Sequence, residues 1–137
     1  MKMKKYQISC PYCGSPALCR PAGMVHGSST QEKGRYLYVC SRWPECDAYV
    51  AAHKKDKSPM GTLANGDLRH KRILAHRALK ELQSFRHMEK WAAYLWLQGK
   101  LGLNEEQAHI GLFSGQICDR VVSLCRQAME SYPQMTA

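Results

Sequence analysis

Two pairs of cysteines near the start of the chain have the spacing of a metal site. Cys10 and Cys13 are separated by two residues and followed by Gly14, and Cys40 and Cys46 form a second, wider pair. Two thiolates two residues apart can bind one tetrahedral ion, and the glycine permits a tight turn that directs backbone N–H groups toward the sulfur atoms. Soft thiolate ligands in a tetrahedral set favour Zn²⁺. The sequence therefore predicts one zinc ion held by these four cysteines.

A shell of four cysteines leaves no position for water, so the predicted zinc ion is structural. The alternative is that the four residues are unconnected buried thiols of a protein in a reducing compartment. The chain has seven cysteines, an odd number that is typical of metal ligands and core residues rather than of disulfides. We expect Cys19 to face the strand interior, and Cys118 and Cys125 to act as small hydrophobic residues on a helix.

Composition limits the kind of protein that the chain can form. Its 137 residues are 45% hydrophobic and 23% charged, which fits one small domain or two very small units. That length is too short for a Rossmann or barrel enzyme. No stretch approaches 18 apolar residues, and the lysine-rich start runs into Tyr6 without the apolar core of a signal peptide. We therefore expect a soluble, cytoplasmic protein with no membrane partner.

The pattern of residues divides the chain into a strand-rich part, 1–57, and a helical part, 58–137. Short segments rich in β-branched and aromatic residues predict an antiparallel sheet from 6–9, 17–20, 35–39 and 48–53. Apolar periodicity and capping residues predict three helices, from residue 65 or 67 to about 84, from about 86 to 101, and from 114 to about 131. A capping box at 104–107 predicts a short turn. We expect an α+β fold, a small zinc ribbon followed by a three-helix unit, either separate or packed together as one domain.

The motifs around the cysteines resemble those of a known family. CPYCG at 10–14, GRY at 34–36 and CSRWPEC at 40–46 look like the four-cysteine zinc ribbon repeated at the C-terminal end of bacterial type I topoisomerases. The resemblance covers about residues 8–50, and it departs in the segment 22–33, which is longer than usual and carries His26. It implies that exposed aromatic and basic residues of the sheet contact single-stranded DNA, at the matching positions Arg35, Tyr36, Tyr38 and Trp43.

Nearly the whole chain is also similar to a family of small zinc-finger-containing proteins of phages and bacteria. The segments that carry this second likeness are PMGTLA at 59–64, LRHKRILAH at 68–76, AYLWL at 93–97 and HIGLF at 109–113. This likeness implies a zinc-binding protein and no particular chemistry.

Charge and aromatic residues predict nucleic acid as the partner. The chain has 20 Lys and Arg against 11 Asp and Glu, a formal charge of +9, which four thiolates and one Zn²⁺ would lower to +7. Phosphates pair with Lys and Arg, and bases stack on aromatic rings. We therefore expect the ribbon to bind single-stranded or distorted DNA or RNA with little sequence preference. The alternative for each ring is that it fills the core of a ribbon that has little else to bury.

A basic stripe on the first predicted helix is a second candidate contact for phosphates. Its members are spaced i, i+3, i+7 and i+11, and they are Arg69, Arg72, His76 and Lys80. Residues with this spacing lie along one face of a helix, where they can follow a phosphate backbone or simply form a solvated surface. We expect His70 and Arg77 to point elsewhere.

Two other functions stay open. The second predicted helix carries three large rings within six residues: Trp91, Tyr94 and Trp96. They cannot all face one core, and an exposed ring would be a candidate anchor for a protein partner. The third hypothesis is a weak nuclease-like enzyme built from His76, His109 and Glu105. The sequence has no second metal motif, paired acidic motif or glycine-rich phosphate loop, so we predict no catalytic residue and no cleavage activity.

Overall fold

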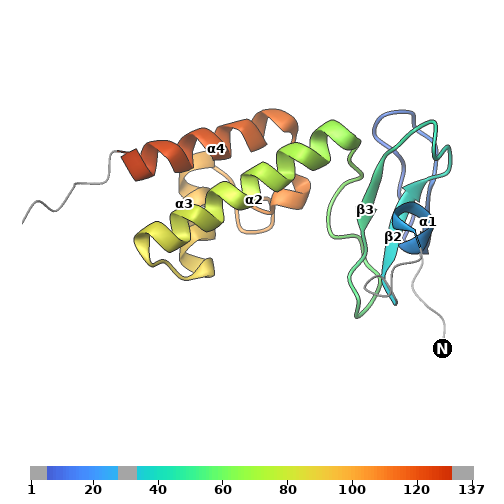
Figure 1. Ribbon diagram of the computed structural model, residues 1–137, viewed down its shortest axis with the longest axis horizontal. Helices are drawn as coiled ribbons and strands as arrows, with labels where there is room; N and C mark the ends of the chain where they lie inside the picture. Colours follow the sequence, from blue (N-terminus) through green and yellow to red (C-terminus); the bar gives the residue numbers. More distant parts are fainter. Residues whose placement is uncertain (1–5, 28–33, 131–137) are drawn as a thin grey trace, which may run out of the picture. The chain divides into compact units, whose positions relative to one another are not determined.

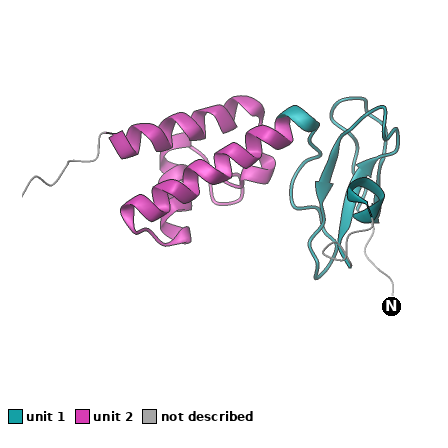
Figure 2. Cartoon of the chain, viewed as in Figure 1, with its two compact units in different colours: residues 1–67 teal, residues 68–137 magenta. Residues whose placement is uncertain are grey.

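The computed structural model describes residues 6–27 and 34–130, and Figure 1 shows the order of its elements. A three-stranded antiparallel sheet is followed by helices, which confirms the predicted α+β class. The chain forms two compact units, residues 1–67 and 68–137 (Figure 2). The first unit extends past the predicted boundary at 57, because backbone bridges from Ala52 to Pro59 and from Tyr49 to Ala64 attach the next segment to the sheet.

The sheet of the first unit contains three short strands in sequence order. They are β1 (Ala17–Pro21), β2 (Tyr36–Cys40) and β3 (Tyr49–Ala51), and β2 is central. The predicted strand at 6–9 contributes only one bridge, from Ser9 to Pro16. A four-residue helix, α1 (Gly23–His26), follows β1 and was not predicted.

The pleat of β2 divides the small core of this unit into two clusters. Tyr38 and Cys40 belong to one cluster, in which the other buried members are Cys10, Ala17, Ala48, Val50, Ala52 and Leu63. Leu37 and Val39 belong to the other, with Ala22, and the half-buried Val25, Trp43, Tyr49 and Ala51 pack against them. Consecutive strand residues point to opposite faces of a sheet. The register of β2 therefore decides which side chains of the ribbon can share a surface.

The second unit is helical. It contains nearly all of α2 (Gly66–Arg86), together with α3 (Lys90–Leu101), the short 3₁₀ helix η2 (Ile110–Leu112) and α4 (Gly115–Glu130). Its largest fully buried side chains include Phe113, Leu82 and Leu97. Ser114 caps α4 as predicted, because its hydroxyl accepts a hydrogen bond from the N–H of Ile117 at 3.3 Å. Within the described residues, no helix is both long and apolar enough to cross a membrane.

The second predicted helix begins later than expected because α2 ends in a left-handed residue. His87 has φ of +54°, and the N–H of Met88 donates to the Gln83 carbonyl at 2.8 Å, which is the pattern of a Schellman cap. Gly102 ends α3 in the same conformation, with φ of +67°, as predicted.

The turn predicted at 104–107 is also present. The N–H of Gln107 donates to the side chain of Asn104 at 2.8 Å, and the N–H of Asn104 donates to the side chain of Gln107 at 3.1 Å. The two reciprocal hydrogen bonds are those of a capping box and confirm the prediction.

Cys118 and Cys125 on α4 are fully buried in the helical core, as expected. Burial disfavours the charged thiolate. It raises the pKa of Cys125 from 9.0 to about 11, and it also raises the pKa of Cys118. Both thiols therefore stay protonated in the folded protein at neutral pH.

Alkaline pH should destabilise the helical unit through Cys125. The unfolded chain loses this proton near pH 9, whereas the folded protein holds it up to about pH 11, so the contribution is fully present below pH 9 and is lost above it. Replacing Cys125→Ala removes the titrating group. Thermal unfolding followed by circular dichroism should show that the advantage of the wild type over the variant is constant below pH 9. It should shrink by about 1 to 2 kcal/mol near pH 10.5. An advantage that is equal at both pH values would contradict this.

Candidate metal centre

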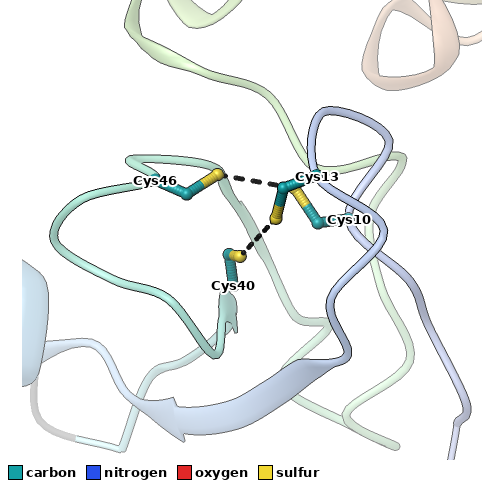
Figure 3. Close-up of side chains that lie close together, drawn as sticks. All are labelled: Cys10, Cys13, Cys40 and Cys46. Atoms are coloured by element: carbon teal, nitrogen blue, oxygen red, sulfur yellow. Dashed lines mark hydrogen bonds between the residues drawn. The ribbon is translucent and has the colours of Figure 1, made fainter.

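The structure brings the four predicted ligand residues together at one end of the sheet (Figure 3). All four Sγ atoms lie within 4.8 Å of one another. The Sγ atoms of Cys10 and Cys46 are 3.6 Å apart, and those of Cys13 and Cys40 are 3.5 Å apart. Sulfur atoms at the corners of a tetrahedral Zn²⁺ site lie about 3.8 Å apart, given Zn–S distances of about 2.3 Å. The spacing therefore fits one zinc ion, and it is too long for disulfides.

A tight turn holds the first cysteine pair in place. Gly14 has φ of +76°, a conformation that suits glycine, and its N–H donates to the Cys10 carbonyl at 2.9 Å. The N–H of Cys10 donates to the Ser15 carbonyl at 2.8 Å. These hydrogen bonds fold the chain back so that Cys10 and Cys13 point to the same place.

The wider second pair is closed by turns of its own. The N–H of Trp43 donates to the Cys40 carbonyl at 2.9 Å, and the N–H of Cys46 donates to the Arg42 carbonyl at 3.1 Å. The N–H of Arg42 also lies 3.4 Å from the sulfur of Cys40 and points toward it. A backbone N–H directed at a sulfur atom stabilises the thiolate that a metal requires.

The thiols of the cluster differ in how readily they ionise, because their surroundings differ. Hydrogen bonds from the side chain and backbone of Ser15 lower the pKa of Cys13 to about 6. Burial raises the pKa of Cys40 to about 12. A metal ion must therefore displace a proton from Cys40 at neutral pH, and zinc affinity should decrease as the pH falls.

Comparison with known families agrees with this geometry. A family model described as a zinc-finger-containing domain matches residues 6–128. The chain belongs to this zinc-finger-containing family. The match includes the helical unit as well as the ribbon. No curated protein and no solved structure matches the chain significantly.

The family and the cysteine cluster together establish what the site binds. The zinc-finger-containing domain holds one structural Zn²⁺, as the sequence predicts. Four thiolates fill a tetrahedral shell, so this ion organises the ribbon and has no open position for a substrate. The likeness of residues 8–50 to topoisomerase ribbons is not supported by these comparisons and stays a similarity of motifs.

The four predicted nucleic-acid contacts of the ribbon do not share one surface. Tyr38 is only 4% exposed, and its hydroxyl donates to the Lys57 carbonyl. The prediction that Tyr38 stacks on a base is therefore wrong, because this ring fills the core. Tyr36 is half-buried on the same face, and the Nζ atom of Lys57 lies 4.0 Å from the centre of its ring. Trp43 packs on the opposite face, with Leu37 and Val39.

Trp43 shares its face of the sheet with two other rings, those of Tyr49 and His26. The ring of Tyr49 meets Trp43 edge to face at a centroid distance of 5.9 Å, and it meets His26 in the same way at 5.5 Å. Tyr49 pairs with Val39 across the sheet, and Leu18 pairs with Val39 from the other side. The pairing of Tyr49 with Val39 depends on how two separate strands align, and no pattern of neighbouring residues indicates it.

Two exposed cations accompany these rings. Arg20 pairs with Leu37 in the sheet, and Arg35 alternates with Leu37 along the chain, so both belong to the face of Trp43. The N–H of Ala22 donates to the Arg35 carbonyl at 2.9 Å, which extends the ladder by one residue. We refer to this surface as the aromatic face, and its members are Leu18, Arg20, His26, Arg35, Trp43 and Tyr49.

The basic stripe predicted on the first helix is divided in the structure. Arg72 is buried, and its Nε donates to the Phe113 carbonyl at 3.2 Å, so the prediction of a phosphate contact at Arg72 is wrong. Arg69 is half-buried. His76 and Lys80 are exposed, and they line a pocket together with Arg77, which was expected to point elsewhere.

The three large rings of α3 are separated, as the spacing predicts. Trp91 is 70% exposed, whereas Tyr94 and Trp96 are half-buried against the helical core. Leu95, one turn after Trp91, is 57% exposed. The two exposed side chains form a small apolar surface on α3.

Loss of one ligand should release zinc and unfold the ribbon. In the variant Cys13→Ser, we expect less than one zinc per chain by elemental analysis and loss of the dispersed ribbon signals in an NMR spectrum. The helical circular dichroism should largely remain, because the helical core contains none of the four cysteines. The matched control is Cys19→Ser, a half-buried cysteine outside the cluster, which should keep one zinc per chain. Equal zinc content in the two variants would contradict the assignment.

Proposed function

We propose that the zinc-finger-containing domain binds single-stranded or distorted DNA or RNA through the aromatic face, with little sequence preference. The observation that carries this proposal is the cluster of Trp43, Tyr49 and His26, which has Arg20 and Arg35 on the same face of the sheet. Stacking requires a ring that is held in place and accessible to a base. Trp43 meets both requirements, because it is half-buried and packed edge-on against Tyr49.

The zinc ion contributes by positioning the stacking ring. Trp43 lies within the loop closed by Cys40 and Cys46, and its N–H donates to the Cys40 carbonyl at 2.9 Å. Metal binding at the two cysteines restrains this loop and with it the orientation of the indole. The structural site therefore acts on nucleic acid indirectly, through the geometry of the aromatic face.

The charge of the first unit suits an anionic partner. Residues 1–67 contain ten Lys and Arg and five Asp and Glu, a formal charge of +5. Four thiolates with one Zn²⁺ contribute −2, so about +3 remains on the folded unit. Phosphate contacts made by Arg20 and Arg35 would add affinity without reading the base sequence.

Removing the stacking ring should weaken binding to a single-stranded oligonucleotide. The variant Trp43→Leu keeps an apolar side chain in the cluster, and it should cost about 1 to 3 kcal/mol in affinity by fluorescence anisotropy. The control is Tyr36→Leu, which removes a half-buried ring from the opposite face and should leave the affinity within about twofold. Zinc content and circular dichroism verify that both variants are folded. A larger loss for Tyr36→Leu than for Trp43→Leu would place the contact on the other face.

Removing a phosphate contact should change the salt dependence instead. For Arg35→Gln, the slope of log K against log salt should become less steep by about 0.7, because one fewer counterion is released from the strand. Arg120→Gln, an exposed change of equal charge on α4, should leave the slope unchanged. If both variants flatten the slope equally, only the net charge matters and Arg35 makes no specific contact.

Binding of a protein partner is the second candidate function. It is favoured by Trp91 and Leu95, which are 70% and 57% exposed and lie one turn apart on α3. Exposed tryptophan is a frequent anchor in protein interfaces. Failure of the folded, zinc-loaded protein to bind any oligonucleotide at low ionic strength would move this candidate to first place.

A further inference from the structure

A pocket of about 440 Å³ in the helical unit gathers positive charge from two helices. Its polar lining comes from His76, Arg77, Lys80 and Gln83 of α2, and from Lys90 and Tyr94 of α3. Leu79, which is 2% exposed, contributes an apolar wall. We refer to this feature as the cationic pocket.

The positive charge of the cationic pocket has no opposite charge among the described residues that line it. Arg77, Lys80 and Lys90 are positive at neutral pH, and no carboxylate lines the pocket. Glu81 and Glu89 are sequence neighbours of these residues but are not part of the lining. Within residues 6–27 and 34–130, none of the three cations forms an ion pair. Like charges held close together repel one another, so an anion in the pocket would relieve this repulsion.

Neutral donors and a helix end complete the environment. Gln83 and Tyr94 are half-buried and bring an amide and a hydroxyl to the pocket. Lys90 is the first residue of α3, and Glu89 at the N-cap makes no side-chain capping hydrogen bond. The N-terminus of a helix carries partial positive charge and favours anions. Partial desolvation of the imidazole, and then the charge of Lys90, lower the pKa of His76, and a neutral imidazole keeps one N–H that can donate to an anion.

We propose that the cationic pocket binds phosphate groups, either those of a free nucleotide or those of a nucleic-acid strand. A phosphate group presents several acceptor oxygens around one centre, which suits a guanidinium and two ammonium groups that line one pocket from two helices. The proposal does not depend on the aromatic face, because every residue of the pocket belongs to the helical unit.

The test is an NMR titration of the full-length, zinc-loaded chain with inorganic pyrophosphate at constant ionic strength. We expect saturable shifts of the His76 ring and of the Gln83 side-chain amide. The variant K80A/K90A should bind pyrophosphate at least about tenfold more weakly. The matched control K100A/R126A removes the same charge from exposed positions of α3 and α4 outside the pocket, and it should change the affinity less than about twofold. Absence of saturable shifts, or equal weakening by the two variants, would overturn the proposal.

A second titration separates the two sources of phosphate. An oligothymidine without terminal phosphates should shift His76 and Gln83 if strand phosphates enter the pocket, whereas pyrophosphate alone should shift them if the ligand is a free nucleotide. Trp43→Leu should leave pyrophosphate binding unchanged. Binding of pyrophosphate without binding of any oligonucleotide would therefore support the cationic pocket and contradict the proposed function of the aromatic face. Binding of an oligonucleotide without binding of pyrophosphate would support the aromatic face and contradict the cationic pocket.

Discussion

Convergence of four sulfur atoms on one zinc ion is the constraint on which the ribbon depends. Cys10 and Cys40 are members of the same buried cluster as Tyr38 and Leu63, so the metal ligands and the apolar core are parts of one structure. Among the described residues, the second cluster on the other face of the sheet has three buried members, Ala22, Leu37 and Val39. A unit with so little apolar surface to bury gains much of its stability from the metal.

The convergence of the four sulfur atoms also links the zinc site to the proposed binding surface, the aromatic face. The ion restrains the loop from Cys40 to Cys46, and Trp43 in that loop packs against Tyr49 of β3. The sheet register then adds Arg20 and Arg35 to the same face. The proposed contact with nucleic acid thus requires no chemistry at zinc itself, since the metal would act on it only by stabilising the ribbon and restraining the loop that carries Trp43.

The helical unit is stabilised in a different way. Its core is apolar and contains no zinc ligand, and Arg72 links α2 to the loop after η2 through the Phe113 carbonyl. A buried guanidinium is tolerated there because it is hydrogen-bonded. The buried apolar side chains of α2 and α3 form this core, and polar side chains of the same two helices line the cationic pocket next to Leu79. The aromatic face thus belongs to a unit stabilised by a metal site, whereas the cationic pocket belongs to a unit stabilised by an apolar core.

Local signals in the sequence predicted the parts of this protein whose structure is local. The Cys-x-x-Cys pair with Gly14, the cap at Ser114, the capping box at 104–107 and the glycine at the end of α3 depend only on residues a few positions apart. The class of the fold and the zinc ion followed from such signals. The break between α2 and α3 was predicted near residue 85 and lies at 87–89, because a histidine in the left-handed conformation leaves no sequence signal of the kind that glycine provides.

The surfaces were decided by contacts between distant parts of the chain. The resemblance to topoisomerase ribbons implied that Tyr36, Tyr38 and Trp43 act together, but the pairing of β1, β2 and β3 places Trp43 opposite the two tyrosines. Helical spacing predicted Arg72 in an exposed stripe, whereas its side chain is buried and donates to the carbonyl of Phe113, 41 residues later in the chain. Arg77 gains its neighbours only because α3 packs beside α2. Residue types and spacing determine which side chains are available for chemistry, and tertiary packing determines which of them meet, because burial and register depend on residues remote in sequence.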